Sequence, residues 1–296
     1  IVLEETKGNL EYNKIKKVQI KENKANNSLI VSVEDENIAQ ARIENNELII
    51  TGKKLGTTKI TLSSSETKNY SSASTEYIVT IIKASNKIVL SSTSGTYTYP
   101  NSGTFSITSN PSGGKLSCTT SNKNVAECTI SGNTVTVKPG TTKGSATLTI
   151  TSEATTNYNA GKAVYAVTTE QGKLSYTANG YEGTYNGNSH GITVTSSGAT
   201  ITYSTDGTNY SSTNPTLTNV GEMVVYYKIN TPGPGYLEKT GSKKIVITKA
   251  DGKVTPPTAK TLKYTGNVQE LVNAGSSTTG QIQYKVGTKG TYSTKI

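Results

Sequence analysis

Apolar and polar residues alternate in short stretches over residues 1–84, with the two-residue period of β-strands that bury one face. The pattern predicts strands over residues 28–33, 47–51, 58–63 and 76–82. Residues 63–75 are rich in Ser, Thr, Asn and Lys, which predicts a loop. Residues 14–20 fit either a strand or an irregular edge. We therefore expect one small β domain over residues 1–84.

The same period continues over residues 85–170, where it predicts seven short strands. They cover residues 88–90, 104–109, 115–119, 126–130, 134–138, 146–151 and 163–168. Turn signals such as the Asn-Pro-Ser-Gly-Gly run at residues 110–114 separate the strands. Seven short strands in a segment of this size favour an immunoglobulin-like β-sandwich.

A repeat relates these two segments. Residues 56–80 align without gaps to residues 144–168, and nine of the 25 aligned pairs are identical. The identical pairs include Gly56 and Gly144, Thr67 and Thr155, Asn69 and Asn157, Tyr70 and Tyr158, and Tyr77 and Tyr165. Each window predicts a strand, a polar turn centred on Asn-Tyr, and a second strand. A period of this size indicates one small β domain that occurs twice.

Residues 171–250 differ in composition but predict a third domain of similar size. Expected strands are residues 200–204, 223–229 and 243–248, and Asp-Gly within residues 205–208 predicts a hairpin turn. The segment ends in Lys249-Ala250, as the first domain ends in Lys83-Ala84. These junctions leave short linkers, so we expect the domains to sit end to end.

Residues 251–296 begin a fourth unit that we expect to be cut short. The two prolines within residues 254–257 exclude a central strand and predict a linker leading into this unit. Tyr284 aligns with Tyr203, and residues 292–294 align with residues 210–212. The closing strands of the third domain have no counterpart here, so an exposed sheet edge and a half-covered core are expected. Since the chain starts at Ile1 without Met, we expect it to be an internal piece of a longer protein.

The chain resembles known bacterial surface modules. Residues 1–170 resemble two bacterial immunoglobulin-like domains of the group 2 type, and residues 171–296 resemble Tyr-Asn-Gly and Tyr-Thr-Gly modules of large Gram-positive cell-surface proteins. The stretches that carry the resemblance are residues 37–43, 47–50 and 56–62, then 124–130, 134–137 and 144–150, and finally 185–191, 203–210 and 269–275. The resemblance implies an all-β row of immunoglobulin-like sandwiches in an extended array, located outside the cell or in the cell wall. Such families are stalks, spacers and adhesin modules without shared catalytic residues.

Composition agrees with several thin β domains. The chain has 18 Tyr but one Phe, one Met and no Trp, and only 32% of its residues are hydrophobic. The net charge is +10, yet Arg42 is the only arginine, which disfavours nucleic-acid binding because arginine dominates phosphate and guanine recognition. The spread lysines suit a solvated surface or a weak attraction to an anionic cell-wall envelope. No stretch approaches the ~20 apolar residues of a membrane span.

The two cysteines, Cys118 and Cys128, align with Val31 and Ala41 of the first domain. Both are in phase with interior positions of their predicted strands, so their side chains should meet in the core. We expect a disulfide, which an exported context permits. Two buried free thiols are the alternative.

Other candidate chemistry is sparse. His190 has no nearby nucleophile and is expected to be a turn histidine, and Glu34-Asp35-Glu36 lacks the ligand spacing of a dedicated Ca²⁺ loop, although weak binding stays open. A Lys–Asn isopeptide crosslink is conceivable, but no pairing stands out. We expect no catalytic residues, no metal and no cofactor.

The tyrosines allow two interpretations. With so few other aromatics they should fill the core, or they could line a face that binds sugar or protein. The tyrosines considered are Tyr97, Tyr99, Tyr181, Tyr185, Tyr203, Tyr210, Tyr226, Tyr227 and Tyr236. The first interpretation fits a monomeric, non-enzymatic stalk or spacer; the second fits an adhesin segment that binds a host protein or glycan. A concentrated exposed aromatic patch would favour the adhesin.

Overall fold

The computed structural model describes residues 1–295, and every regular element within them is a β-strand. The chain forms two compact units: Ile1–Lys173 together with Gly233–Leu237, and Leu174–Pro232 together with Glu238–Ile296. Each predicted domain over residues 1–250 holds its own cluster of buried hydrophobic side chains. Over the described part of the chain, no helix has the length and apolarity needed to cross a membrane.

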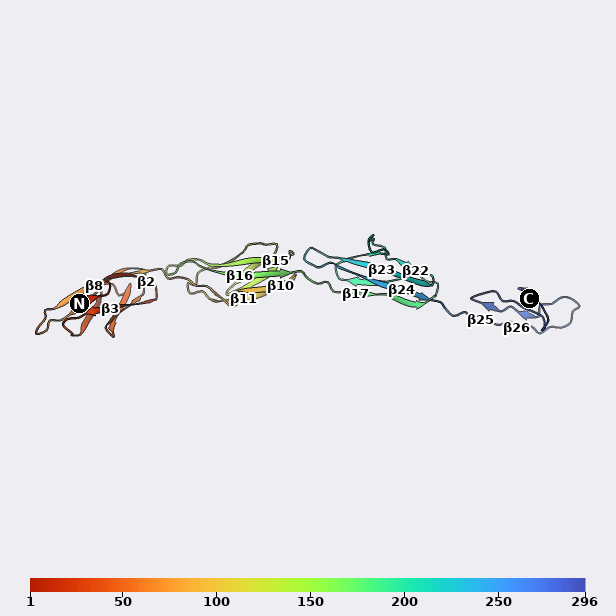
Figure 1. Ribbon diagram of the computed structural model, residues 1–296, viewed down its shortest axis with the longest axis horizontal. Helices are drawn as coiled ribbons and strands as arrows, with labels where there is room; N and C mark the ends of the chain where they lie inside the picture. The colour runs from red at the N-terminus through yellow and green to blue at the C-terminus, as the bar shows by residue number, and fades with distance from the viewer. Residues whose placement is uncertain (296) are drawn as a thin grey trace. The chain divides into compact units, whose positions relative to one another are not determined.

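The first domain is a sandwich of two four-stranded sheets, β1-β3-β6-β5 and β2-β8-β7-β4. Val18, Ile20 and Leu48 of one sheet pack with Ile60 and Leu62 of the other in the core. Strand β2 runs parallel to the long strand β8, beside which it lies (Figure 1). The strands are β1 (Val2–Leu3), β2 (Lys7–Glu11), β3 (Ile15–Glu22), β4 (Leu29–Val33), β5 (Ala39–Glu44), β6 (Glu47–Gly52), β7 (Gly56–Ser64) and β8 (Ala73–Ile82).

The second domain repeats this topology with sheets β9-β11-β14-β13 and β10-β16-β15-β12, and β10 again runs parallel to the last strand, β16. Phe105 stacks on Tyr165 in its core, with ring centroids 3.9 Å apart. The strands are β9 (Val89–Leu90), β10 (Ser94–Thr98), β11 (Gly103–Ser109), β12 (Leu116–Thr120), β13 (Ala126–Ser131), β14 (Thr134–Pro139), β15 (Gly144–Ser152) and β16 (Gly161–Glu170).

Two expectations for these domains need correction. The second domain has eight strands rather than seven, because β10 was missed. Its Ser-Gly-Thr-Tyr-Thr sequence has little apolar alternation, and the strand is held by pairing with β16. The loop predicted over residues 63–75 is shorter, since β7 continues to Ser64 and β8 begins at Ala73. The polar residues at both ends belong to the hydrogen-bonded ladder, which pairs Ser64 with Ala73. The ambiguous residues 14–20 lie largely in strand β3.

The third domain keeps one four-stranded sheet, β18-β24-β23-β21, with β18 parallel to β24. Two short sheets, β17-β20 and β19-β22, complete it. The predicted turn over residues 205–208 forms and is closed by one bridge between Tyr203 and Ser211, but β21 itself pairs with β23. The strands are β17 (Tyr176–Asn179), β18 (Tyr181–Thr184), β19 (His190–Gly191), β20 (Thr193–Ser196), β21 (Thr200–Ser204), β22 (Thr216–Leu217), β23 (Gly221–Asn230) and β24 (Lys239–Thr248).

Over residues 251–295, the fourth segment forms two short sheets, β25-β28 and β26-β27. Its strands are β25 (Val254–Thr255), β26 (Thr258–Ala259), β27 (Val272–Asn273) and β28 (Ser276–Ser277). The linker predicted at residues 254–257 is therefore wrong in part: β25 pairs, and the two prolines lie between β25 and β26. No described residue after position 250 is buried, and Tyr264 is 97% exposed. The bridge between Tyr284 and Ser293 matches that between Tyr203 and Ser211, as the alignment of the two segments predicts.

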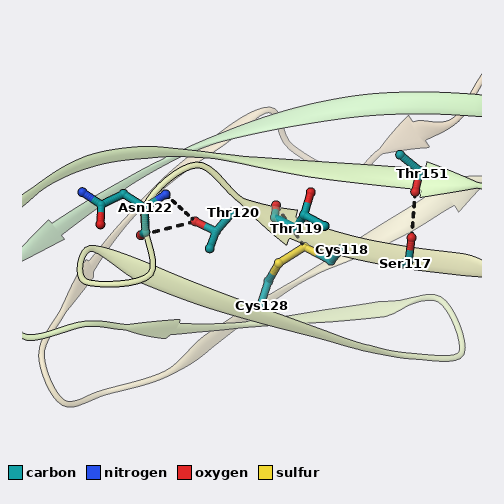
Figure 2. Close-up of a disulfide and its surroundings, with 7 residues drawn as sticks. All are labelled: Ser117, Cys118, Thr119, Thr120, Asn122, Cys128 and Thr151. Atoms are coloured by element: carbon teal, nitrogen blue, oxygen red, sulfur yellow. Dashed lines mark hydrogen bonds between the residues drawn. A yellow bond between two sulfur atoms is a disulfide. The ribbon is translucent and has the colours of Figure 1, made fainter.

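A disulfide joins the two sheets of the second domain. Cys118 of β12 and Cys128 of β13 are linked, with their Cα atoms 6.1 Å apart (Figure 2). Both side chains are half-buried and pack against the core, as the alignment with Val31 and Ala41 led us to expect. The crosslink therefore ties the edge strand of one sheet to the edge strand of the other.

Replacing Cys118 by Val and Cys128 by Ala, the residues at the aligned positions of the first domain, tests this crosslink. The double variant should lose about 2–3 kcal/mol of unfolding free energy in the second domain, because a short covalent loop restricts the unfolded chain. Hydrogen exchange in denaturant, followed on peptides from residues 85–170, measures the loss. Peptides from the first domain serve as the internal control, and unchanged protection of the second domain would contradict a stabilising disulfide.

Candidate functional site

Backbone and side-chain hydrogen bonds hold the junction between the first and second domains, which lie in the same compact unit. The Ala84 N–H donates to the Asn157 carbonyl at 2.9 Å, and the Asn159 N–H donates to the Ala84 carbonyl at 2.9 Å. Ala84 and Tyr158 thus form a parallel β-bridge. Only 1% of Ala84 is exposed. The linker is therefore inserted as a strand against the β15–β16 loop of the second domain.

Side chains reinforce this bridge on both sides. The Lys83 Nζ donates to the Thr155 carbonyl at 2.7 Å, and the Ser85 hydroxyl donates to the Glu11 carboxylate at 2.8 Å. Tyr12 and Tyr158 pack edge to face, with centroids 5.7 Å apart. Such aromatic pairs contribute about 0.5–1.5 kcal/mol beyond their buried area. An open cleft lies beside them, lined by Tyr12, Asn13, Pro111, Ser112 and residues 155–158.

The local sequence explains why these groups meet. Tyr12 directly follows β2, and its N–H donates to the Ile82 carbonyl at 2.9 Å, which places its ring beside the end of β8. Asn13 then reverses the chain with a positive φ of 59°, a conformation that Asn adopts more readily than most residues. At the other end of the linker, the buried Asn86 amide donates to the side chains of Asn110 and Ser112 at 3.0 and 2.8 Å.

The same arrangement recurs in the first unit where residues 233–237 meet the end of the second domain. Gly172 donates to the Gly235 carbonyl at 2.9 Å and accepts from Leu237 at 3.0 Å, which forms a parallel bridge with Tyr236. The Gln171 side-chain amide donates to the Pro234 carbonyl at 3.4 Å. Tyr99 and Tyr236 pack edge to face at 5.2 Å, as Tyr12 and Tyr158 do. The backbone bridge, the side-chain donor to a loop carbonyl and the aromatic pair of the first junction therefore each have a counterpart.

Gly172 stands where the first junction has Ala84, and the space around it explains the difference. A Cβ atom on Gly172 would collide with the Tyr99 carbonyl and would lie 2.8 Å from the Tyr236 ring. The tighter aromatic packing at this second junction therefore requires glycine.

The titratable groups with shifted pKa values lie within single domains, in burial or hydrogen-bond settings that account for the shifts. Burial raises the pKa of the Tyr97 hydroxyl, which hydrogen-bonds the Tyr165 hydroxyl at 2.9 Å. A hydrogen bond to Glu5, 2.9 Å away, raises the pKa of Lys16. Backbone N–H donation from Asn209 leads the causes that lower the pKa of Asp206, whose carboxylate holds the 205–208 turn together. These pKa shifts therefore come from burial or from hydrogen bonds.

The other residues singled out by sequence lie in local structural roles. The His190 ring stacks on Tyr181 at 3.8 Å, and its Nε2 lies 3.0 Å from the Asn186 side-chain oxygen. The Asp35 carboxylate accepts the Asn37 N–H at 2.9 Å and so caps a turn. Across residues 1–295, no group of three or more His, Cys, Asp or Glu is placed to hold a metal.

The tyrosines lie in cores, at junctions or on the surface. Tyr97 and Tyr227 pack in or against domain cores, whereas Tyr185 and Tyr226 are exposed. Sequence analysis missed the junction role of Tyr12 and Tyr158, because each ring is ordered by a partner from another domain. The available signal was the Asn-Tyr pair that recurs at the same place in both repeat windows.

No protein-family model matches the chain, and no curated protein matches it. Among solved structures, it is similar to domains 4 and 5 of the S-layer protein SbsC, with 18% identity over 48% of this chain and 75% of that chain and a TM-score of 0.26. A domain tandem of titin is 8% identical over 82% and 97%, with a TM-score of 0.30. Extracellular cadherin domains 3–6 of protocadherin gamma B2 are 10% identical over 88% and 76%, with a TM-score of 0.26. Because these TM-scores are low, the fold assignment rests on the strand pairing above.

A double-mutant cycle on Tyr12→Ala and Tyr158→Ala tests the aromatic contact. We expect a coupling of about 0.5–1.5 kcal/mol in the unfolding free energy of the second domain, since the rings contact each other directly. Hydrogen exchange in denaturant supplies the free energies. The control cycle uses Tyr12→Ala with Tyr70→Ala, because Tyr70 occupies the equivalent loop of the first domain, and should give no coupling. Equal results for the two cycles would contradict the assigned contact.

Proposed function

We propose that the chain is a non-enzymatic stalk or spacer segment of a bacterial cell-surface protein, which holds a distal module away from the cell wall. One observation carries this proposal: each of the four linker residues from Lys83 to Asn86 makes a hydrogen bond to one of the two domains that it joins. In a flexible linker that lets the domains move freely, the hydrogen-bonding groups of these residues would bond to water instead. The linker instead behaves as a part of both domains.

The mechanism of such a stalk is mechanical. Each sandwich is held by its own hydrophobic core, and the junction restricts rotation between neighbours through a backbone bridge, a lysine contact and an aromatic pair. A similar bridge and aromatic pair around Gly172 show that this kind of contact is not confined to Ala84 within the first unit. Length then grows with the number of domains, and no catalytic group is needed.

The Cys118–Cys128 disulfide supports a location outside the cytoplasm, because such crosslinks persist in oxidising environments. The resemblance of the sequence to Gram-positive surface modules supports the cell surface or cell wall in particular. Lysines distributed over the chain suit contact with an anionic envelope.

An adhesin segment that binds a host protein or glycan is the alternative. The observation that favours it is the exposure of Tyr185 and Tyr226 in the third domain, since exposed tyrosines are common binding anchors. Most other tyrosines are engaged in cores or junctions, so we place the stalk first.

Distance measurements across the first junction test the stalk. Spin labels on Ile30→Cys of β4 and Val164→Cys of β16, both exposed positions, report the separation of the two domains. We expect one narrow distance distribution. Ala84→Pro should broaden it, because proline lacks the N–H that bonds to Asn157. Ala84→Ser keeps that N–H and is the matched control, with a distribution as narrow as that of the native chain.

A native distribution as broad as that of the Ala84→Pro variant would contradict a stiff stalk. A glycan or host protein that binds on an array through residues 171–250, and loses binding on Tyr185→Ala with Tyr226→Ala, would favour the adhesin.

A further inference from the structure

The first domain has its own copy of the loop that receives the linker in the second domain. Residues 65–72 connect β7 to β8, as residues 153–160 connect β15 to β16. The turn is the same in both: the Thr67 N–H donates to the Tyr70 carbonyl at 2.8 Å, and the Thr155 N–H donates to the Tyr158 carbonyl at 3.0 Å. Thr, Asn and Tyr occupy equivalent positions in the two loops.

The two loops differ in what covers them. In the second domain Thr155, Asn157 and Tyr158 are half-buried beneath the end of the first domain, whereas Thr67 and Asn69 are exposed and Tyr70 is 49% exposed. The Ser71 N–H corresponds to that of Asn159, and the Asn69 carbonyl corresponds to that of Asn157. Within residues 1–295, neither of these first-domain groups has a backbone hydrogen-bond partner. The loop therefore presents the bridging edge in a preformed but uncovered state.

We propose that the 65–72 loop is a docking surface for the end of another immunoglobulin-like sandwich, joined to Ile1 through a linker like residues 83–87. The inference rests on the proposed function, since it adds a junction to the stalk. The occupant is defined by three groups that both occupied junctions share: a Tyr ring beside the end of the last strand, a Lys or Gln after that strand, and then an Ala or Gly. These match Tyr70, the Thr67 carbonyl and the Asn69–Ser71 backbone of the loop.

The start of the first domain fits this mode of connection. Ile1-Val2-Leu3 is identical to Ile88-Val89-Leu90, with which the second domain begins directly after its linker. Val2–Leu3 pairs with β3 as Val89–Leu90 pairs with β11, in equivalent sheets. Ile1 packs against the first core as Ile88 packs in the second. A linker that reaches Ile1 would therefore pass the Tyr70 loop as residues 84–87 pass the Tyr158 loop.

The third domain carries a complementary end that is exposed among residues 1–295. The Tyr185 N–H donates to the Thr248 carbonyl at 2.8 Å, as Tyr12 donates to Ile82 and Tyr99 to Glu170. Tyr185 is 42% exposed, and Lys249 and Ala250 beyond β24 are exposed. Ala84 and Gly172, at the corresponding positions, are both buried. This end has the chemistry that the Tyr70 loop is proposed to accept, so a second copy of the chain is the competing occupant.

An extended chain tests the docking, with Ile1–Lys87 repeated directly ahead of Ile1 so that a natural linker enters the first domain. Only the original 296 residues carry isotope labels, introduced by segmental ligation. We expect the Ser71 amide to exchange about tenfold or more slowly than in the unextended chain, because a bridging amide exchanges only when the junction opens. Tyr12→Ala in the added copy should partly reverse the slowing, and Ala84→Pro there should abolish it. Ala84→Ser in the added copy is the matched control and should keep it.

Equal Ser71 exchange in the extended and unextended chains would overturn the proposal. In the unextended chain, the Ser71 amide could instead be protected more strongly as the protein concentration rises. If Tyr185→Ala removed that protection, the proposal would be overturned in favour of a second copy as the occupant. The spin-label distance between positions 30 and 164 in the unextended chain distinguishes failure of the docking proposal from failure of the stalk proposal. A narrow distance distribution together with an unprotected Ser71 amide would contradict the docking surface alone and leave the proposed function standing.

Discussion

The backbone bridge between Ala84 and Tyr158 is the interaction on which the arrangement of the first two domains depends. Strand β8 ends at Ile82, and a chain that leaves a sheet would expose its next N–H and C=O groups to water or leave them unpaired. Here both groups of Ala84 are satisfied by the β15–β16 loop of the next domain. Backbone hydrogen bonding thus continues from the first sandwich into the second, and these bonds fix the direction in which the linker runs.

The aromatic pairs follow from the sheet topology of each domain. Strands β2 and β10 run parallel to the last strand of their domains, so the residue after each of them lies at the end from which the linker leaves. That residue is Tyr12 or Tyr99, and its ring meets the Tyr of the receiving loop. Parallel pairing of a short polar strand therefore completes the sheet and also places a tyrosine ring at the junction.

Sequence patterns predicted the strands and core positions within each domain, but they missed the contacts that a domain makes with its neighbour. Strands such as β8 and β16 alternate clearly, and Cys118 and Cys128 could be paired through their alignment with Val31 and Ala41, because these positions are set by the core. Strand β10 has little apolar alternation and could not be found by its period. The contacts of Tyr158 and Ala84 reach across domains, and only the repeated Asn-Tyr turn indicated that the loop had a constant role.

The most direct test of the account is whether the first two domains tumble as one body. Residual dipolar couplings of amides in residues 1–84 and 85–170 should fit a single alignment tensor, with one magnitude and one orientation. Coupling sets that require two tensors, with a smaller magnitude for one domain, would show that the Ala84 bridge does not fix the junction and would contradict the account.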